Sequence, residues 1–236
     1  MMPKGIFITG TDTGVGKTFV ACGLAALLRG SGYRVGVMKP AESGCGERAD
    51  KLFPQDAALL KDASGCEVPL DQICAYPLRE PLAPSIAAER QNITIDVGKL
   101  MDIYEEISSG HDITLVEGAG GLMVPLLPSY TYADFARVLR LPLIVVAANR
   151  LGAINHTLLT LEHARCKGLH VLGYVLNQLE ASGSPAAETN RESLLALNCA
   201  PCLGEIPYMD GATQKAGLAE LVDEYIDDRL LAAVLG

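Results

Sequence analysis

Residues 10–18, with the sequence GTDTGVGKT, have the composition and placement of a phosphate-binding loop. They follow the apolar run at residues 6–9 and precede a segment rich in alanine and leucine, as a loop between a strand and a helix would. Glycines allow backbone N–H groups to turn toward phosphate oxygens, which the positive end of the helix dipole also attracts. Lys17 adds a mobile cation, and Thr18 offers a hydroxyl to Mg²⁺. The predicted nucleotide contacts here are Gly14, Val15, Gly16, Lys17 and Thr18.

One position departs from the usual pattern of such loops. The pattern has a glycine where this chain has Thr11, and Gly10 lies one position too early. An ordinary glycine-rich turn is therefore the alternative interpretation. The apolar strand before the loop, the Gly-Lys-Thr sequence within it and the helix after it favour phosphate binding.

Thr18, Asp56 and Glu117 are candidate Mg²⁺ ligands because Mg²⁺ prefers hard oxygen donors. Glu117 follows the apolar residues 113–116, where a second nucleotide motif would place a carboxylate. The alternatives are a turn or capping residue at Glu117 and a helix N-cap at Asp56. The predicted nucleotide contacts after Glu117 are Gly118, Ala119 and Gly120.

Lys39 follows a predicted strand at residues 33–38. We expect this strand to lie beside the first one, so that the Lys39 ammonium reaches the phosphate loop from the side opposite Lys17. Two lysines would then stabilise the charge on a transferring phosphoryl group. The alternative for Lys39 is a solvated lysine at a strand end. Ser43 follows shortly after and carries no signal of its own.

Residues 152–156, GAINH, begin a predicted helix whose free N–H groups could bind a carboxylate or a phosphate, although a plain helix start explains them equally well. His156 and His163 lack a carboxylate-rich metal-ligand pattern and are interpreted as packing or surface residues. Cys199 and Cys202 have redox-like spacing, but a single pair is interpreted as structural thiols.

Asn177 and Gln178 end another predicted strand. They resemble the guanine-reading Asn-Lys-x-Asp pattern but lack both its lysine and its aspartate. An asparagine side chain can still donate to and accept from a purine edge. This pattern favours adenine over guanine as the bound base.

The elements that must position these residues alternate between apolar strands and helices. Such alternation predicts an α/β fold with a mostly parallel sheet, helices on both faces, and ligands beyond the carboxyl ends of the strands. Residues 42–55 are predicted to form a polar loop and residues 76–84 an irregular stretch, and long excursions of this kind often border a site. Strands are expected at residues 6–9, 33–38, 113–116, 143–147, 171–176 and 202–205. Helices are expected at residues 17–29, 56–61, 96–109, 154–167 and 185–197, with an acidic helix at the C-terminus.

Composition bounds the class of protein. The chain of 236 residues has no linker-like tract and is expected to form one domain over residues 1–236. Its net charge of −9 and pI near 4.9 argue against nucleic acid and anionic membranes as partners. No secretory signal or membrane span is recognisable, and seven scattered cysteines suit reduced thiols. We therefore expect a cytoplasmic protein.

Several blocks, taken in order, resemble the dethiobiotin synthetases of biotin biosynthesis. The blocks are TGTDTGVGKT at residues 9–18, KPAESG at 39–44, EGAGG at 117–121, LGAINH at 151–156 and GEIP at 204–207. The resemblance runs from the first strand to about residue 208. It implies the P-loop NTPase fold and a homodimeric, ATP-dependent ligase.

The resemblance also implies a reaction and a role for each matching residue. The enzyme would convert 7,8-diaminononanoate, CO₂ and MgATP to dethiobiotin, ADP and phosphate through a carbamate and a carbamic–phosphoric anhydride. By position, Lys17 and Lys39 would stabilise the carbamate and the transferring phosphoryl group. The remaining implied contacts are Thr13 and Ser43 near the carbamate; Thr18, Asp56 and Glu117 on Mg²⁺; Asn177, Gln178, Pro207 and Tyr208 at the adenine; and Gly152, Ala153, Ile154 and Asn155 of a second subunit on the substrate carboxylate.

Two positions depart from the family pattern. Gln178 stands where aspartate is frequent, which leaves selectivity for the base open, and Gly14 stands where an acidic residue is frequent. Two other functions remain alternatives. One is another amide-forming ligase of the same fold. The other is a partitioning or septum-site ATPase, a dimeric switch that binds partners rather than making a metabolite. The ATPases usually carry a signature lysine where this chain has Asp12, and the tail at residues 221–228 is acidic rather than basic.

Overall fold

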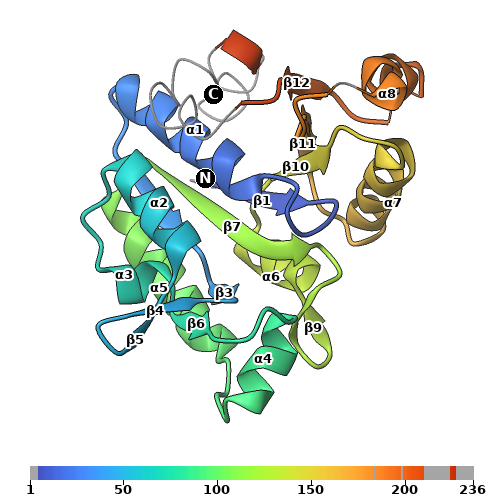
Figure 1. Cartoon of the computed structure of the whole chain (residues 1–236). Coiled ribbons are helices and arrows are strands. Elements are labelled where there is room, and N and C mark those ends of the chain that lie inside the picture. Colours follow the sequence, from blue (N-terminus) through green and yellow to red (C-terminus); the bar gives the residue numbers. More distant parts are fainter. Residues whose placement is uncertain (1–4, 183, 198, 210–223, 227–236) are drawn as a thin grey trace.

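The computed structural model describes residues 5–182, 184–197, 199–209 and 224–226. Within these ranges the centre of the protein is a parallel sheet of six strands in the order β12-β11-β10-β1-β7-β2 (Figure 1). The strands are β1 (Gly5–Gly10), β2 (Val35–Met38), β7 (Ile113–Gly121), β10 (Leu143–Ala148), β11 (Val171–Asn177) and β12 (Cys202–Ile206). The predicted fold class is confirmed.

Helices cover both faces of this sheet because its strands are apolar on both sides. In β1, Ile6 and Ile8 pack in the hydrophobic cluster that includes α1 and α2, whereas Phe7 packs in the cluster that includes α5 and α6. A third cluster joins α7 and α8 to β10 and β11. The helices are α1 (Lys17–Gly30), α2 (Gln55–Ser64), α3 (Leu70–Ile73), α4 (Pro84–Arg90), α5 (Val97–Gly110), α6 (Tyr132–Leu139), α7 (Ala153–Cys166) and α8 (Pro185–Ala196).

Two segments predicted to be irregular contain regular structure. Residues 42–55 include an antiparallel hairpin of β4 (Gly46–Arg48) and β5 (Lys51–Phe53), whose turn residues Ala49 and Asp50 have φ of 50° and 59°. Residues 76–84 include β6 (Tyr76–Leu78), which pairs with β3 (Ala41–Ser43), and the start of α4. These strands are three residues long, too short to show an alternating pattern in the sequence.

The predicted position of β2 in the sheet is wrong. We expected it beside β1, but β7 lies between them: Val37 of β2 is in register with Leu115 of β7, and Phe7 of β1 is in register with Val116. Strand order depends on contacts between distant parts of the chain, which a local pattern does not encode. As a consequence, the residue after β2, Lys39, lies next to β7 and its Glu117.

Other predicted elements lie at least partly outside the described ranges. Of the predicted acidic C-terminal helix and of the acidic tail, only residues 224–226 are described.

Two further short strands, β8 (Pro125–Leu127) and β9 (Tyr130–Thr131), pair after β7 and lead into α6. In the part of the chain that is described, no helix combines the length and the apolar character needed to cross a bilayer.

Candidate active site

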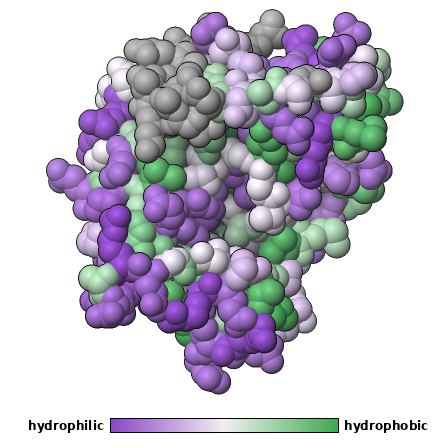
Figure 2. Space-filling model, viewed as in Figure 1, coloured by the Kyte–Doolittle hydropathy of each residue, from purple (hydrophilic) through white to green (hydrophobic). Residues whose placement is uncertain are grey.

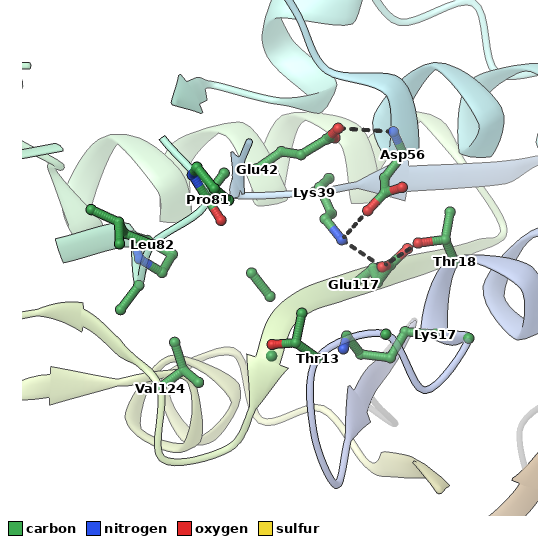
Figure 3. A pocket seen from close by; sticks show the side chains of 17 residues that line it. Thr13, Lys17, Thr18, Lys39, Glu42, Asp56, Pro81, Leu82, Glu117 and Val124 are labelled. Carbon is green, nitrogen blue, oxygen red and sulfur yellow. Dashed lines mark hydrogen bonds and ion pairs between the residues drawn. The ribbon is translucent and has the colours of Figure 1, made fainter. Parts of the chain in front are cut away.

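A cavity of about 700 Å³ opens where β1, β2 and β7 end. The phosphate loop and the start of α1 line one side with Lys17 and Thr18, while Pro81, Leu82 and Val124 line another (Figure 3). The cavity therefore combines a polar end with an apolar wall, as a site for an amphipathic ligand would. The visible face of the molecule as a whole is largely polar (Figure 2).

The predicted phosphate loop has the backbone that anion binding requires. Gly16 caps α1 with φ of 90°, and a Cβ at this position would collide with the side chain of Asn177. Only glycine satisfies both conditions without strain. The ammonium of Lys17 donates to the backbone oxygen of Asp12 at 3.0 Å, so it lies folded over the loop at the edge of the cavity. The first N–H groups of α1 lack helical partners and are available to phosphate oxygens.

Lys39 links the two predicted metal carboxylates. Its Nζ lies 2.5 Å from Oε1 of Glu117 and 3.1 Å from Oδ2 of Asp56, and it also approaches the backbone oxygen of Gly118 at 3.5 Å (Figure 3). The same Oε1 of Glu117 accepts a hydrogen bond from the hydroxyl of Thr18 at 2.9 Å. The Lys39 side chain is only 3 % exposed, so the interpretation of a solvated lysine is wrong.

The two lysines have opposite electrostatic environments. Burial and the nearby charge of Lys39 lower the pKa of Lys17 to about 8. Burial would also lower the pKa of Lys39, but the ion pairs with Glu117 and Asp56 outweigh it and raise that pKa above its usual value. Lys39 is thus held in the charged form.

Glu42 is a functional candidate that the sequence analysis missed. Its carboxylate accepts hydrogen bonds from the backbone N–H groups of Asp56 and Ala57, at 2.9 and 3.0 Å, and so satisfies the start of α2. Asp56 is therefore free of the capping role that was its alternative, and its side chain turns to Lys39. Burial is the main reason that the pKa of Glu42 is raised.

The donor set fits a magnesium ion that is completed by a nucleotide. Oε2 of Glu117 is buried and has no hydrogen-bond partner, although its side chain is only 1 % exposed. A buried carboxylate oxygen without a partner is costly, and a cation would satisfy it. In the described part of the chain no three His, Cys, Asp or Glu side chains form a metal site by themselves. Magnesium, which keeps water and phosphate ligands, does not require such a set.

The other predicted site residues fall into two groups. Thr13, Gly14, Ser43, Ala119 and Gly120 line the same cavity. The other two do not line it: Val15 is buried, and the backbone oxygen of Gly118 faces the ammonium of Lys39.

A second, smaller cleft of about 240 Å³ lies on the other side of Gly16. Asn177, Gln178, Pro207 and Tyr208 line it, as expected for residues predicted to border the same base. The amide nitrogen of Asn177 uses one of its two hydrogens to donate to the backbone oxygen of Val15 at 3.0 Å, which leaves the other hydrogen and the amide oxygen for a ligand. The structure thus brings the two predicted base-binding segments together beside the phosphate loop.

The predicted carboxylate-binding segment is separate from the cavity. Gly152 caps α7 with φ of 93°, and Ala153, Ile154 and Asn155 form its first turn, but none of the four lines the 700 Å³ cavity of the same subunit. His156 is exposed and His163 is partly buried against a different groove. Cys199 and Cys202 are free thiols of intermediate exposure.

Relatives decide the family. A protein-family model described as an AAA domain matches residues 4–216. The ATP-dependent dethiobiotin synthetase BioD of Bacillus cereus (strain G9842) is 40 % identical over 223 residues, which cover 94 % of this chain and 91 % of the relative. The enzyme of the same name from Anaeromyxobacter dehalogenans (strain 2CP-C) is 40 % identical over 90 % of this chain and 94 % of its own. The chain belongs to the dethiobiotin synthetase family.

Solved structures that are similar show the fold. The septum site-determining protein MinD from Pyrococcus horikoshii OT3, in complex with Mg-ADP, superposes with a TM-score of 0.56 and 18 % identity, over 92 % of this chain and 86 % of its own. A ParA family ATPase from Chlorobium tepidum TLS has a TM-score of 0.57 and 12 % identity, over 99 % and 97 %. The expected resemblance to dethiobiotin synthetases, the P-loop NTPase-type fold and the assignment as an ATP-dependent ligase are confirmed.

Proposed function

We propose that this member of the dethiobiotin synthetase family converts 7,8-diaminononanoate, CO₂ and MgATP to dethiobiotin, ADP and phosphate. The observation that carries this proposal is the pair of lysines, Lys17 and Lys39, on either side of Glu117 and Thr18 at the end of the sheet. Two cations and a magnesium-type donor set suit a reaction that moves a phosphoryl group between anionic oxygens. The apolar wall of Pro81, Leu82 and Val124 suits the alkyl chain of the substrate.

The proposed reaction has three steps. One amine of the substrate attacks CO₂ and loses a proton, which gives a carbamate. A carbamate oxygen then attacks the γ-phosphorus of ATP, and ADP leaves. The second amine attacks the carbonyl carbon of this mixed anhydride, loses a proton and expels phosphate, which closes the five-membered ureido ring.

Each residue has a role in this scheme. The ammonium groups of Lys17 and Lys39 stabilise charge on the carbamate and on the phosphoryl oxygens, and the hydroxyls of Thr13 and Ser43 donate to the carbamate. Thr18, Asp56 and Glu117 would hold Mg²⁺, which, when bound, neutralises charge on the phosphates. Lys39 has a second duty, because its ammonium holds Asp56 and Glu117 close together before any nucleotide binds.

We propose ATP as the nucleotide, with its adenine in the cleft beside Gly16. Asn177 and Gln178 on one wall and Pro207 and Tyr208 on the other would contact the ring. Tyr208 is 43 % exposed, as an aromatic side chain available to stack on a base would be.

We also propose a homodimer of full-length chains in the cytoplasm, with a substrate site shared between subunits. The proposal is supported by the separation of residues 152–155 from the cavity of their own subunit. It is also supported by exposed apolar side chains near them, namely Leu151 at 87 %, Leu159 at 61 % and Met123 at 68 %. The N–H groups at the start of α7 would then bind the substrate carboxylate of the partner's site. Mixing Lys39→Ala chains with Asn155→Asp chains, whose added carboxylate would repel that of the substrate, should restore turnover that neither variant has alone, since a mixed dimer keeps one intact site.

The rival function, a partner-regulated ATPase switch, receives support from the fold of MinD and ParA ATPases alone. Asp12 stands at the position of their signature lysine, and its carboxylate lies 3.8 Å from Arg150 of the same chain. A carboxylate there would repel phosphate rather than bind it.

The test is incorporation of labelled carbon from bicarbonate into an acid-stable product. We expect incorporation that requires both MgATP and the diamine, with one ADP formed for each carbon fixed. ATP turnover that ignores the diamine and responds to another protein would reject the proposal in favour of the switch. ATP turnover with a different amine or carboxylate would favour another ligase of the same fold.

A further inference from the structure

Asn149 is a buried polar residue that the proposed mechanism does not use. It lies at the carboxyl end of β10, is 5 % exposed, and makes a complete set of side-chain hydrogen bonds. Its amide nitrogen donates to Oε1 of Glu205 at 2.7 Å and to the backbone oxygen of Ala187 at 3.2 Å. Its amide oxygen accepts from the side chain of Asn190 at 2.8 Å. A buried network of this kind fixes the direction of every group in it.

The network reaches across the sheet. Asn149 directly follows β10, and Glu205 belongs to β12; these two strands lie on either side of β11. The backbone N–H of Asn149 also donates to the oxygen of Asn177, the last residue of β11, at 2.8 Å. Asn190 of α8 closes the network by donating to the backbone oxygen of Arg150 at 3.0 Å. Through these hydrogen bonds, Asn149 links the end of β11, the end of β12 and the helix α8 to one another.

These strand ends carry the walls of the smaller cleft. Asn177 at the end of β11 and the two residues after it form one wall, and residues 207–209, which follow β12, form the other. Gly16 and Phe19 also line the cleft. Asn149, Asn190 and Glu205 do not line the cleft themselves. They act on it only through the strands that they hold.

β12 needs such an anchor because it lies at the edge of the sheet. It pairs with β11 on one side, and on its other side the described residues make only one bridge, between Gly204 and Ile226. The backbone N–H of Gln178 donates to the oxygen of Ile206 at 2.9 Å, which is the last ladder bond before the two walls diverge. The Asn149–Glu205 contact lies one residue before that bond on β12, so it adds a side-chain cross-link where the walls begin.

We propose that Asn149, with Glu205 as its partner, positions the nucleotide base by setting the width of the cleft between residues 177–179 and 207–209. This inference rests on the proposed place of the base, and it assigns a positioning role to residues that touch neither the nucleotide nor the substrate. A hydrogen bond to a charged carboxylate has both the strength and the direction for this role.

The test compares two ligands that share phosphates and differ in the base. Binding of MgADP and of inorganic tripolyphosphate is measured by calorimetry for the wild type and for Asn149→Ala, Glu205→Ala and Glu205→Gln. Glutamine at position 205 keeps an acceptor oxygen for the amide of Asn149, whereas alanine does not. Glu192→Ala, an exposed carboxylate on α8, is the matched control.

We expect Asn149→Ala and Glu205→Ala to weaken the binding of MgADP by about tenfold or more, because a partly buried hydrogen bond to a carboxylate is lost beside the cleft. Tripolyphosphate binding should stay unchanged in every variant. Glu205→Gln, which keeps the acceptor but not the charge, should weaken MgADP binding clearly less than Glu205→Ala, and Glu192→Ala should behave as the wild type. The proposal is overturned if Glu205→Ala keeps its affinity for MgADP, if both ligands weaken together, or if Glu205→Gln is as weak as Glu205→Ala. If Asn149→Ala does not fold, the two Glu205 variants decide alone. Because no substrate amine is present, the result is independent of whether the chain makes dethiobiotin.

Discussion

Two lysine–carboxylate ion pairs in this protein are similar in length but differ in burial and in the other contacts of the carboxylate. Lys39 and Glu117 lie 2.5 Å apart beside the large cavity, with side chains that are 3 % and 1 % exposed. Lys167, which follows α7, and Asp134 of α6 lie 2.9 Å apart near the surface, with side chains that are 34 % and 15 % exposed. The pairs differ most in what else the carboxylate does.

Asp134 is saturated with partners. One oxygen accepts from Lys167, and the other accepts from the backbone and the hydroxyl of Thr131 in the capping box of α6, at 2.9 and 2.8 Å. Glu117, in contrast, leaves a buried oxygen without a partner. A saturated pair stabilises the fold, whereas a buried pair with spare capacity costs stability and suits a site that awaits a ligand. The two pairs therefore differ in the hydrogen-bonding capacity of the carboxylate: Glu117, in the proposed functional pair, has an oxygen without a partner, and Asp134, in the structural pair, does not.

The largest effect that this comparison predicts is on turnover in Lys39→Ala. We expect a fall on the order of 10²-fold or more, because charge on the transferring phosphoryl group loses a fixed cation. The measurement is the rate of ADP formation with saturating diamine and bicarbonate, after circular dichroism has confirmed the fold.

Lys167→Ala makes the same change in the structural pair and is the control. It should keep wild-type turnover. If a folded Lys39→Ala variant kept its rate, or if both variants lost it equally, the distinction between the pairs would fail.

The next effect is on magnesium. Glu117→Gln keeps the shape of the side chain and an oxygen for the hydroxyl of Thr18 but removes the charge. Since even groups behind metal ligands change affinity by about 10–100-fold, we expect the Mg²⁺ concentration for half-maximal turnover to rise by at least about tenfold. Asp134→Asn, the same kind of change in the other pair, should leave that concentration unaltered. An unchanged magnesium requirement in Glu117→Gln would remove Glu117 from the metal site.

A smaller effect is on stability in Asp134→Asn. Burial would raise the pKa of Asp134, but the bonds from Thr131 and Lys167 lower it to about 2 from an ordinary value of 3.8. Stability from this group is complete above the unfolded value and is lost as pH falls toward 2. Because the pair is at the surface, we expect the variant to lose about 1 kcal/mol at neutral pH.

Urea unfolding at several pH values measures this loss. The difference between wild type and Asp134→Asn should shrink as the pH falls below about 4, where the unfolded carboxyl becomes protonated. A difference that grows in acid would contradict the assignment.

The smallest effect concerns a third pair. Arg165 and Glu162 lie 2.5 Å apart on α7 and are 75 % and 58 % exposed, so solvent screens their attraction. We expect Glu162→Gln to leave both the urea midpoint and turnover unchanged. A clear shift of the midpoint would show that exposure alone does not determine how much each pair contributes to stability.

Much of the site could be predicted from the sequence because its signals are local. The phosphate loop joins a strand to a helix within residues 5–30, and Glu117 follows an uninterrupted apolar run, so both residue types and spacing are visible. The helix α6 also had a local signal that was missed. Thr131 and Asp134 form a capping box, whose spacing can be read before an apolar segment.

The rest depends on contacts between distant residues. The strand before Lys39 was expected beside β1, but it lies beside β7, because the order of strands is set by packing of the whole sheet. Glu42 of β3 contacts the start of α2, 14 positions away along the chain. Asn149 meets Glu205 across a strand, 56 positions away along the chain. Contacts of this kind, between residues far apart in the sequence, cannot be predicted from a local pattern.

The central claim is that a carbamate oxygen, rather than water, attacks the γ-phosphorus. Bicarbonate labelled with ¹⁸O tests it most directly, in a reaction with MgATP and the diamine that is quenched before the label exchanges with water. The account predicts that the phosphate released with each ureido ring carries one oxygen from the bicarbonate. Phosphate that takes its new oxygen only from water would contradict it.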